Sequence, residues 1–168
     1  EFITIIKDIE KKTGGFAAII GHSLGGMAAL LAVKRGVTAK KVVTINTPVS
    51  IDFIFDSFAA QLGASSKSIA YISRFLENMT QMPIDEFTAD KLVSNMQVPG
   101  MIIHDRDDKE IPVDQAYSLH QGWDKSTLTL TRQLGHRRIL HDQDTISNII
   151  RNLSILEKQE ALRVPLAE

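Results

Sequence analysis

The sequence predicts an α/β fold in which helices flank a parallel sheet and a helical segment is inserted. Short apolar or β-branched runs alternate with longer segments of helical periodicity, which is the pattern of β-α-β units in a sheet covered on both faces. One stretch, residues 49–95, interrupts this alternation. It contains no strong strand signal, and its apolar residues recur at helical spacing.

The composition is that of an ordinary globular chain of one domain. The chain has 168 residues, of which 43% are hydrophobic and 23% are charged. Nineteen basic and twenty acidic residues give a net charge of −1, so we expect neither nucleic acid nor a membrane as a partner. The absence of cysteine excludes disulfides, thiolate metal sites and cysteine nucleophiles.

The first part of the chain predicts two helices and two strands in alternation. Residues 1–12 place apolar side chains at helical spacing before a pair of glycines. The apolar run 16–21 is short and bounded by glycine, which favours a strand. Residues 24–34 are rich in Ala and Leu and predict a helix, and the β-branched run 41–46 predicts the second strand.

The rest of the chain predicts a helical insertion followed by two further strand–helix units. Residues 49–95 predict two or three amphipathic helices. Residues 98–104 and 126–132 predict strands, the second with β-branched alternation. Residues 113–121 predict a helix between these strands, and residues 142–158 predict a closing helix.

A serine motif, Gly21-His22-Ser23-Leu24-Gly25-Gly26, lies where the first predicted strand passes into a helix. A Gly-x-Ser-x-Gly pattern at such a junction puts the serine on a sharp turn above the sheet, and we expect side chains at Gly21 or Gly25 to collide with neighbouring backbone. The backbone N–H of Leu24 would donate to a developing oxyanion. A phosphate-binding loop is excluded because no Lys-Ser or Lys-Thr follows the glycines. We interpret Ser23 as a nucleophile rather than an incidental residue of a glycine-rich turn.

A serine nucleophile needs a base and an acid that orients the base, and candidates for both follow later in the chain. Residues 104–112 and 133–138 follow predicted strands, so both loops leave the same edge of the sheet as Ser23. The second loop offers His136 as the base. The first loop offers four acids, of which only one is required: Asp105, Asp107, Asp108 and Glu110.

Other interpretations of these residues are weaker. A calcium loop at 105–110 lacks the glycine and the terminal glutamate that such loops carry. We expect His22 to be a packed neighbour of the serine and His104 to be structural. No metal or cofactor site is expected.

These motifs resemble the α/β-hydrolase superfamily. Residues 21–26 match its nucleophile elbow, residues 104–112 are similar to its acid loop (usually His-Gly-x-x-Asp-x-x-Val/Ile-Pro), and Gly135-His136 matches its catalytic-histidine loop. The resemblance implies that Ser23 is the nucleophile and that His136 acts as general base and then general acid. It also implies that Asp108 orients His136, with Asp107 as the runner-up.

The resemblance further implies a division into a core, residues 1–48 and 96–168, and a cap or lid, residues 49–95. Such a cap would cover the site and decide the shape of the substrate. We expect four phenylalanines of this segment to be shared between its own packing and an acyl pocket: Phe53, Phe55, Phe58 and Phe75.

The sequence departs from the family pattern in two ways. Asp105 stands where the family usually has glycine. The resemblance also covers only the C-terminal half of the family, so the early loop that supplies a second oxyanion N–H has no counterpart. We therefore expect strand 16–21 to expose an apolar edge, covered by a missing N-terminal half or by a second copy in a homo-oligomer.

The expected function is that of a serine hydrolase of small-molecule carboxylic esters or related acyl compounds, acting through an acyl-enzyme. Alternatives are an acyltransferase, thioesterase or peptidase with the same triad, or a non-catalytic binding protein of this fold. Because losing one oxyanion donor costs ~10²–10³ in rate, this chain alone is expected to be a weak enzyme. A cytoplasmic location is the default expectation, since no targeting segment is visible.

Overall fold

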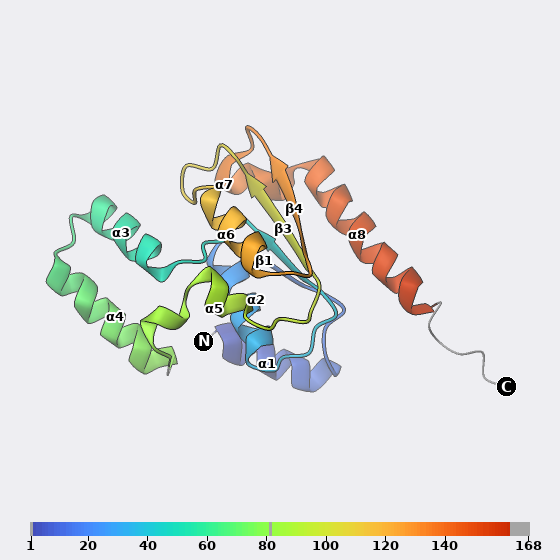
Figure 1. Cartoon of the computed structure of the whole chain (residues 1–168), viewed down its shortest axis with the longest axis horizontal. Coiled ribbons are helices and arrows are strands. Elements are labelled where there is room, and N and C mark those ends of the chain that lie inside the picture. Colours follow the sequence, from blue (N-terminus) through green and yellow to red (C-terminus); the bar gives the residue numbers. More distant parts are fainter. Residues whose placement is uncertain (1, 81, 162–168) are drawn as a thin grey trace.

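A four-stranded parallel sheet forms the centre of the molecule (Figure 1). The computed structural model describes residues 2–80 and 82–161, except for the side chains of residues 58, 79, 80 and 156–161. The order of the strands in the sheet follows their order in the chain, so each connection is a crossover. The strands are β1 (Ile19–His22), β2 (Val42–Ile45), β3 (Gly100–Asp105) and β4 (Ser126–Thr131).

Helices occupy the connections, as the alternating sequence pattern predicts. The predicted helix at residues 24–34 is found with the same bounds, and the others differ by one to three residues at their ends. The helices are α1 (Phe2–Thr13), α2 (Leu24–Lys34), α3 (Ile51–Leu62), α4 (Ser66–Thr80), α5 (Ala89–Val93), α6 (Asp114–Gly122), α7 (Gly135–Arg138) and α8 (Gln143–Ala161), with 3-10 turns η1 (Ile84–Glu86) and η2 (Ile139–His141).

Successive residues of the strands pack into two separate layers of core. Val42 and Ile102 belong to the layer that includes buried residues of α2, α5 and α6. Val43 and Ile103 belong to the opposite layer, which Ile149 of α8 closes. This alternation is the period of two that a strand imposes on its side chains, so the sheet is covered on both faces as predicted.

The structure differs from the sequence prediction at the first strand. The predicted strand covers residues 16–21, but regular pairing with β2 starts only at Ile19, opposite Val42. Phe16 forms an isolated parallel bridge with Ala39. The short helix α7, which carries His136, was also not predicted, because a four-residue segment is too short to show helical periodicity.

Residues 49–95 contain helices that are placed differently with respect to the sheet. Ser50 caps the start of helix α3: its Oγ accepts a hydrogen bond from the N–H of Phe53 at 3.2 Å. Figure 1 shows α3 and α4 projecting beyond the helices that cover the sheet. In contrast, Leu92 and Val93 of α5 are buried in the main core. Whether residues 49–95 act as a cap stays a prediction.

The phenylalanines of this segment have different environments. Phe55 is buried in the main core, whereas Phe75 on α4 is largely exposed. Phe53 lines a cavity that is described below. The side chain of Phe58 lies outside the described residues.

The edge of the sheet at β1 carries an exposed apolar side chain. Among the described residues, β1 pairs with β2 alone, and Ile20 of β1 is 51% exposed. The neighbouring helix α1 has no buried residue, and its apolar side chains Phe2, Ile5 and Ile9 are all exposed. Among the described residues, no helix is both long enough and apolar enough to cross a bilayer.

Candidate active site

Ser23 lies at the turn where β1 passes into α2. Its backbone angles are φ 53° and ψ −131°, a conformation that costs a non-glycine residue about 1–3 kcal/mol and that is typical of functional turns. Its N–H donates to the carbonyl oxygen of Ile45 on β2 at 2.9 Å. Ser23 is therefore held on the carboxyl edge of the sheet, at the start of α2, which is the place that the Gly-x-Ser-x-Gly pattern predicts.

The backbone N–H of Leu24 is the expected oxyanion donor. Leu24 is the first residue of α2, so its N–H has no acceptor within the helix. The positive end of the helix dipole lies at this terminus. The arrangement favours a negative charge beside Ser23.

Of the two glycine collisions predicted for the serine motif, the one at Gly21 is confirmed and the one at Gly25 is not. A Cβ atom at Gly21 would lie 2.5 Å from the carbonyl oxygen of Gly25 and 2.5 Å from the Cα of Gly26. A Cβ atom at Gly26 would lie 1.9 Å from Oγ1 of Thr47. A Cβ atom at Gly25 would meet nothing within 4 Å. The collision predicted for Gly25 is therefore wrong: Gly21 approaches the backbone of Gly25 and Gly26, and Gly26 is approached by Thr47, which follows β2.

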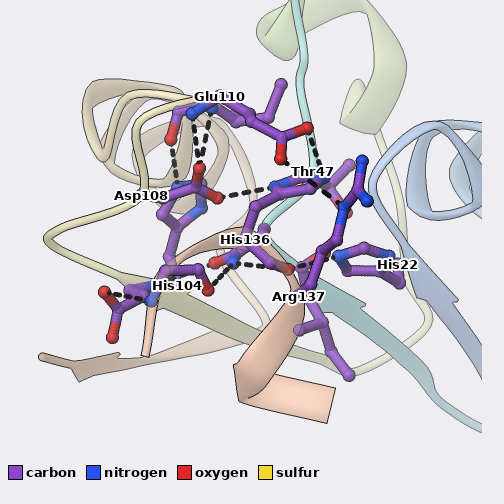
Figure 2. Close-up of polar contacts among 12 residues, drawn as sticks. His22, Thr47, His104, Asp108, Glu110, His136 and Arg137 are labelled. Atoms are coloured by element: carbon purple, nitrogen blue, oxygen red, sulfur yellow. Dashed lines mark hydrogen bonds and ion pairs between the residues drawn. The ribbon is translucent and has the colours of Figure 1, made fainter. Parts of the chain in front are cut away.

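His136 and Asp108 are hydrogen-bonded to each other (Figure 2). The distance between Nδ1 of His136 and Oδ2 of Asp108 is 2.7 Å, and the Asp108 side chain is fully buried. A carboxylate oxygen accepts, so the proton is on Nδ1. In the neutral form of the ring, this tautomer leaves Nε2 without a proton.

The other oxygen of Asp108 is bound by the backbone of its own loop. Oδ1 accepts from the N–H of Glu110 at 2.8 Å and from the N–H of Ile111 at 3.0 Å. Nε2–H of His104 donates to the carbonyl oxygen of Ile111 at 2.9 Å, which closes the loop. Burial lowers the pKa of His104 below 6.5, so the ring is held neutral. These contacts fix the direction in which Asp108 points.

The runner-up acid, Asp107, contacts a different group. Its Oδ2 accepts from the backbone N–H of Gln133 at 2.8 Å. The neighbouring Asp105 also binds backbone N–H groups near His136. Asp108 is therefore the carboxylate that is bonded to the ring of His136.

His22 packs against His136. The two ring centroids are 4.6 Å apart, and Nε2–H of His22 donates to the carbonyl oxygen of His136 at 2.8 Å. Burial lowers the pKa of His22 despite this hydrogen bond. Figure 2 shows the ring of His22 beside the backbone of α7, so His22 supports His136 from the side of β1.

The Nε2 atom of His136 faces a second carboxylate, that of Glu110. The distance from Nε2 to Oε2 of Glu110 is 3.8 Å, and Arg137 holds the other oxygen of Glu110 with its Nε at 3.7 Å. Within the described part of the chain, the hydroxyl of Ser23 forms no hydrogen bond with His136. Catalytic hydrogen bonds of this kind are often formed only when substrate is bound.

A cavity of about 180 Å³ adjoins Ser23. Its walls combine apolar side chains with polar ones, among them the carboxylate of Glu110. They include Ser23, Leu24, Pro48, Phe53, Ile54 and Glu110. A larger cavity of about 510 Å³ lies between the start of α3 and α6, but none of the expected catalytic residues line it. The smaller cavity is therefore the better candidate for a substrate pocket.

Solved structures of similar architecture identify the fold. An α/β hydrolase from the metagenome of lagoon sediments at Mar Chica, Morocco, matches 93% of this chain with a TM-score of 0.65 and 16% identity. The esterase domain of a Rhodothermus marinus protein matches 85% with a TM-score of 0.58 and 21% identity. An esterase of Exiguobacterium antarcticum matches 90% with a TM-score of 0.62 and 12% identity. The chain has the α/β-hydrolase fold.

The chain spans only part of these α/β-hydrolase structures. The matched regions make up 69% of the Mar Chica enzyme, 60% of the Rhodothermus domain and 72% of the Exiguobacterium esterase. No protein-family model and no curated protein sequence matches the chain. At these low identities the likeness shows the α/β-hydrolase fold alone.

Two residues of the candidate site have places that the sequence analysis did not predict. Asn46 is buried at the end of β2 and donates from Nδ2 to the carbonyl oxygen of Gly135 at 3.0 Å. Glu110 was a candidate for the acid that orients His136, and it instead lines the cavity beside Ser23. The position of Asn46 after a strand, at the same edge as Ser23, was the available signal. Across the described residues, no three His, Asp or Glu side chains converge as a metal site would require.

Proposed function

We propose that this protein is a serine hydrolase that cleaves carboxylic esters or related acyl compounds through an acyl-enzyme. The observation that carries the proposal is the 2.7 Å hydrogen bond between Asp108 and His136. It leaves the imidazole in the tautomer that a general base requires, at the sheet edge where the strained turn presents Ser23.

In the first half-reaction the acyl group is transferred to Ser23. Oγ of Ser23 attacks the carbonyl carbon of the ester while Nε2 of His136 takes the hydroxyl proton, and Asp108 stabilises the resulting imidazolium. The electron pair of the carbonyl π bond moves to the oxygen, which accepts a hydrogen bond from the N–H of Leu24. The tetrahedral intermediate then expels the alcohol, which leaves with the proton from Nε2.

In the second half-reaction water takes the place of the alcohol. Nε2 of His136 removes a proton from the water, whose oxygen attacks the acyl carbon. The new intermediate releases Oγ of Ser23, which recovers its proton from His136. The products are a carboxylic acid and the free enzyme.

The cavity beside Ser23 indicates the size of the substrate group that is held. At about 180 Å³ it suits a short acyl or alcohol group rather than a long chain. Its apolar wall is formed by residues such as Phe53 and Ile54 of α3. This fits the proposed role of residues 49–95 as a cap that selects the substrate.

Intact mass after exposure to a fluorophosphonate tests the proposal. The reagent forms a bond between its phosphorus and an activated serine oxygen, and fluoride leaves. We expect one adduct on the wild-type chain and none on Ser23→Ala, with Ser57→Ala as a matched control because Ser57 lines the same cavity. An adduct that still forms on Ser23→Ala would contradict the proposal. A folded wild-type chain that forms no adduct would also contradict it and would favour a non-catalytic binding protein.

The acceptor and the location are tested separately. Rates of release from matched ester, thioester and aminoacyl substrates distinguish an esterase from a thioesterase or a peptidase, and product analysis with added alcohols detects acyl transfer.

We propose a cytoplasmic location, which fractionation of the source cells would test.

A further inference from the structure

The carboxylate of Asp105 lies beneath the loop that carries His136. Each of its hydrogen-bond partners is an N–H or O–H donor. Oδ1 accepts from the N–H of Gly135 and from the N–H of Asp107, each at 3.0 Å. Oδ2 accepts from the N–H of Leu134 at 3.1 Å and from the hydroxyl of Thr131 at 2.7 Å. Asp105 is completely buried. A buried carboxylate that accepts from four donors is fully hydrogen-bonded, so its burial does not carry the free-energy cost of a missing hydrogen bond.

The loop around His136 is bent so that successive N–H groups converge on carboxylates. Gln133 has a φ of 63° and Gly135 a φ of 66°, both left-handed. The N–H of Gln133 donates to Asp107, and those of Leu134 and Gly135 donate to Asp105. Consecutive backbone N–H groups arranged in this way form an anion-binding nest. The nest is filled here by side chains of the protein itself.

Asn46 also binds the loop that carries His136, through the carbonyl group of Gly135. Its Oδ1 accepts from the N–H of Asp105 at 2.8 Å, and its Nδ2 donates to the carbonyl oxygen of Gly135 at 3.0 Å. The backbone of Gly135 is thus bound on both sides, by Asp105 at its N–H and by Asn46 at its carbonyl. Because His136 follows directly, these contacts also restrict the position of its Cα atom.

The charge of Asp105 is kept by these contacts. Burial alone would raise its pKa, but the donors from Gly135, Thr131 and Leu134 outweigh burial and lower it below 3.8. The group is therefore ionised at neutral pH. Glycine, which the family pattern has at this position, offers no acceptor for the N–H groups of Leu134 and Gly135.

We propose that Asp105 is a positioning residue that sets the place of His136, and hence its hydrogen bond to Asp108, by binding the backbone of the histidine loop. The proposal rests on the hydrolase function proposed above, but its geometric part concerns only the loop. A displacement of about 1 Å at a catalytic base lowers the rate by ~10²-fold, so loss of this carboxylate has a large expected effect.

The test compares Asp105→Asn with Thr131→Val. Asp105→Asn keeps the shape of the side chain but replaces one carboxylate oxygen with an NH2 group, which faces N–H or O–H donors. The side chain can then accept hydrogen bonds from the loop at one oxygen instead of two. Thr131→Val removes one donor from the same carboxylate and leaves both loop N–H contacts in place, so it controls for general loss of stability. Circular dichroism and the melting temperature report folding for each variant.

Two readouts separate positioning from a merely structural role. The first is the downfield proton NMR signal of Nδ1–H of His136, which depends on the hydrogen bond to Asp108. The second is the pH profile of the rate of fluorophosphonate labelling at Ser23. We expect Asp105→Asn to lose the downfield signal and to react ~10²-fold more slowly while still folded. We expect Thr131→Val to keep both the signal and the profile.

Each outcome decides the proposal. A folded Asp105→Asn variant with the wild-type signal and labelling rate would overturn it, and so would an equal loss in Thr131→Val. If Asp105→Asn does not fold, hydrogen exchange on the wild-type chain decides: fast exchange at the amides of both Leu134 and Gly135 overturns the proposal. The NMR signal exists whether or not Ser23 reacts, so failure of the hydrolase function is distinguishable from failure of this inference.

Discussion

Nδ1 of His136 and Oδ2 of Asp108 are 2.7 Å apart, although the two residues are separated by 28 positions in the chain. Two loops at the ends of the neighbouring strands β3 and β4 bring them together. Because parallel strands end at one edge, the same arrangement brings both loops to the side of the sheet where Ser23 lies.

We expect Asp108→Asn to lower the rate of fluorophosphonate labelling by ~10⁴-fold without unfolding the chain. The amide would donate where the carboxylate accepts, so the ring would be held in the wrong tautomer. Asp107→Asn is the matched control, since Asp107 binds the backbone of Gln133 instead. Labelling kinetics of both variants check the prediction, and a larger effect of Asp107→Asn would contradict it.

Alanine at the glycines of the serine motif is expected to have opposite effects on stability. Gly26→Ala would place a Cβ atom on Thr47 and should lower the free energy of unfolding by about 1–3 kcal/mol. Gly25→Ala meets open space on the helix α2 and should raise it by about 0.5–1 kcal/mol. Urea unfolding measures both. Equal destabilisation by the two substitutions would show that the contact at Thr47 is not decisive.

The carboxylate of Glu110 is expected to select substrates by charge. It lines the cavity beside Ser23 and lies 3.8 Å from Nε2 of His136, so an anionic group on the substrate would be repelled. Glu110→Gln should raise kcat/KM for an anionic ester relative to its neutral analogue by about tenfold at low salt, and less at high salt. An unchanged ratio between the two esters would rule out this role.

The stability of the fold is expected to fall as the pH is lowered from 7 to 5. Burial lowers the pKa values of His104 and His22 in the folded state. The unfolded chain therefore takes up protons near pH 6.5 that the folded chain does not, which favours unfolding as the pH falls. Urea unfolding at several pH values measures the effect. His104→Gln, which retains an N–H donor for Ile111, should reduce it; a steeper dependence in that variant would argue against this cause.

The exposed apolar side chains of β1 and of α1 are expected to be covered by further polypeptide. Ile20 and Ile5 are each 51% exposed, and an unpaired edge strand of this kind promotes association. In a solution of the 168-residue chain, the available polypeptide is a second copy. Light scattering should therefore show self-association that rises with concentration, and Ile20→Lys should reduce it. A monomer at all concentrations would contradict the prediction.

Much of the fold follows from local patterns that act over a few residues. Helix α2 could be predicted with its bounds because an Ala- and Leu-rich run starts directly after the serine motif. Parallel pairing followed from strands that alternate with helices. In contrast, the start of β1 depends on where β2 lies beside it, which no local pattern reports.

The sequence by itself determined the types and order of the candidate catalytic residues, since a serine turn, an acid loop and a Gly-His loop each have a local signature. Tertiary structure alone decided which acid contacts His136. Asp105, Asp107 and Asp108 are near neighbours of one residue type, and only the path of the backbone after β3 directs Asp108 to the ring and the other two to backbone N–H groups. Hydrogen bonds depend on distances in space, and sequence spacing within a loop does not set these distances.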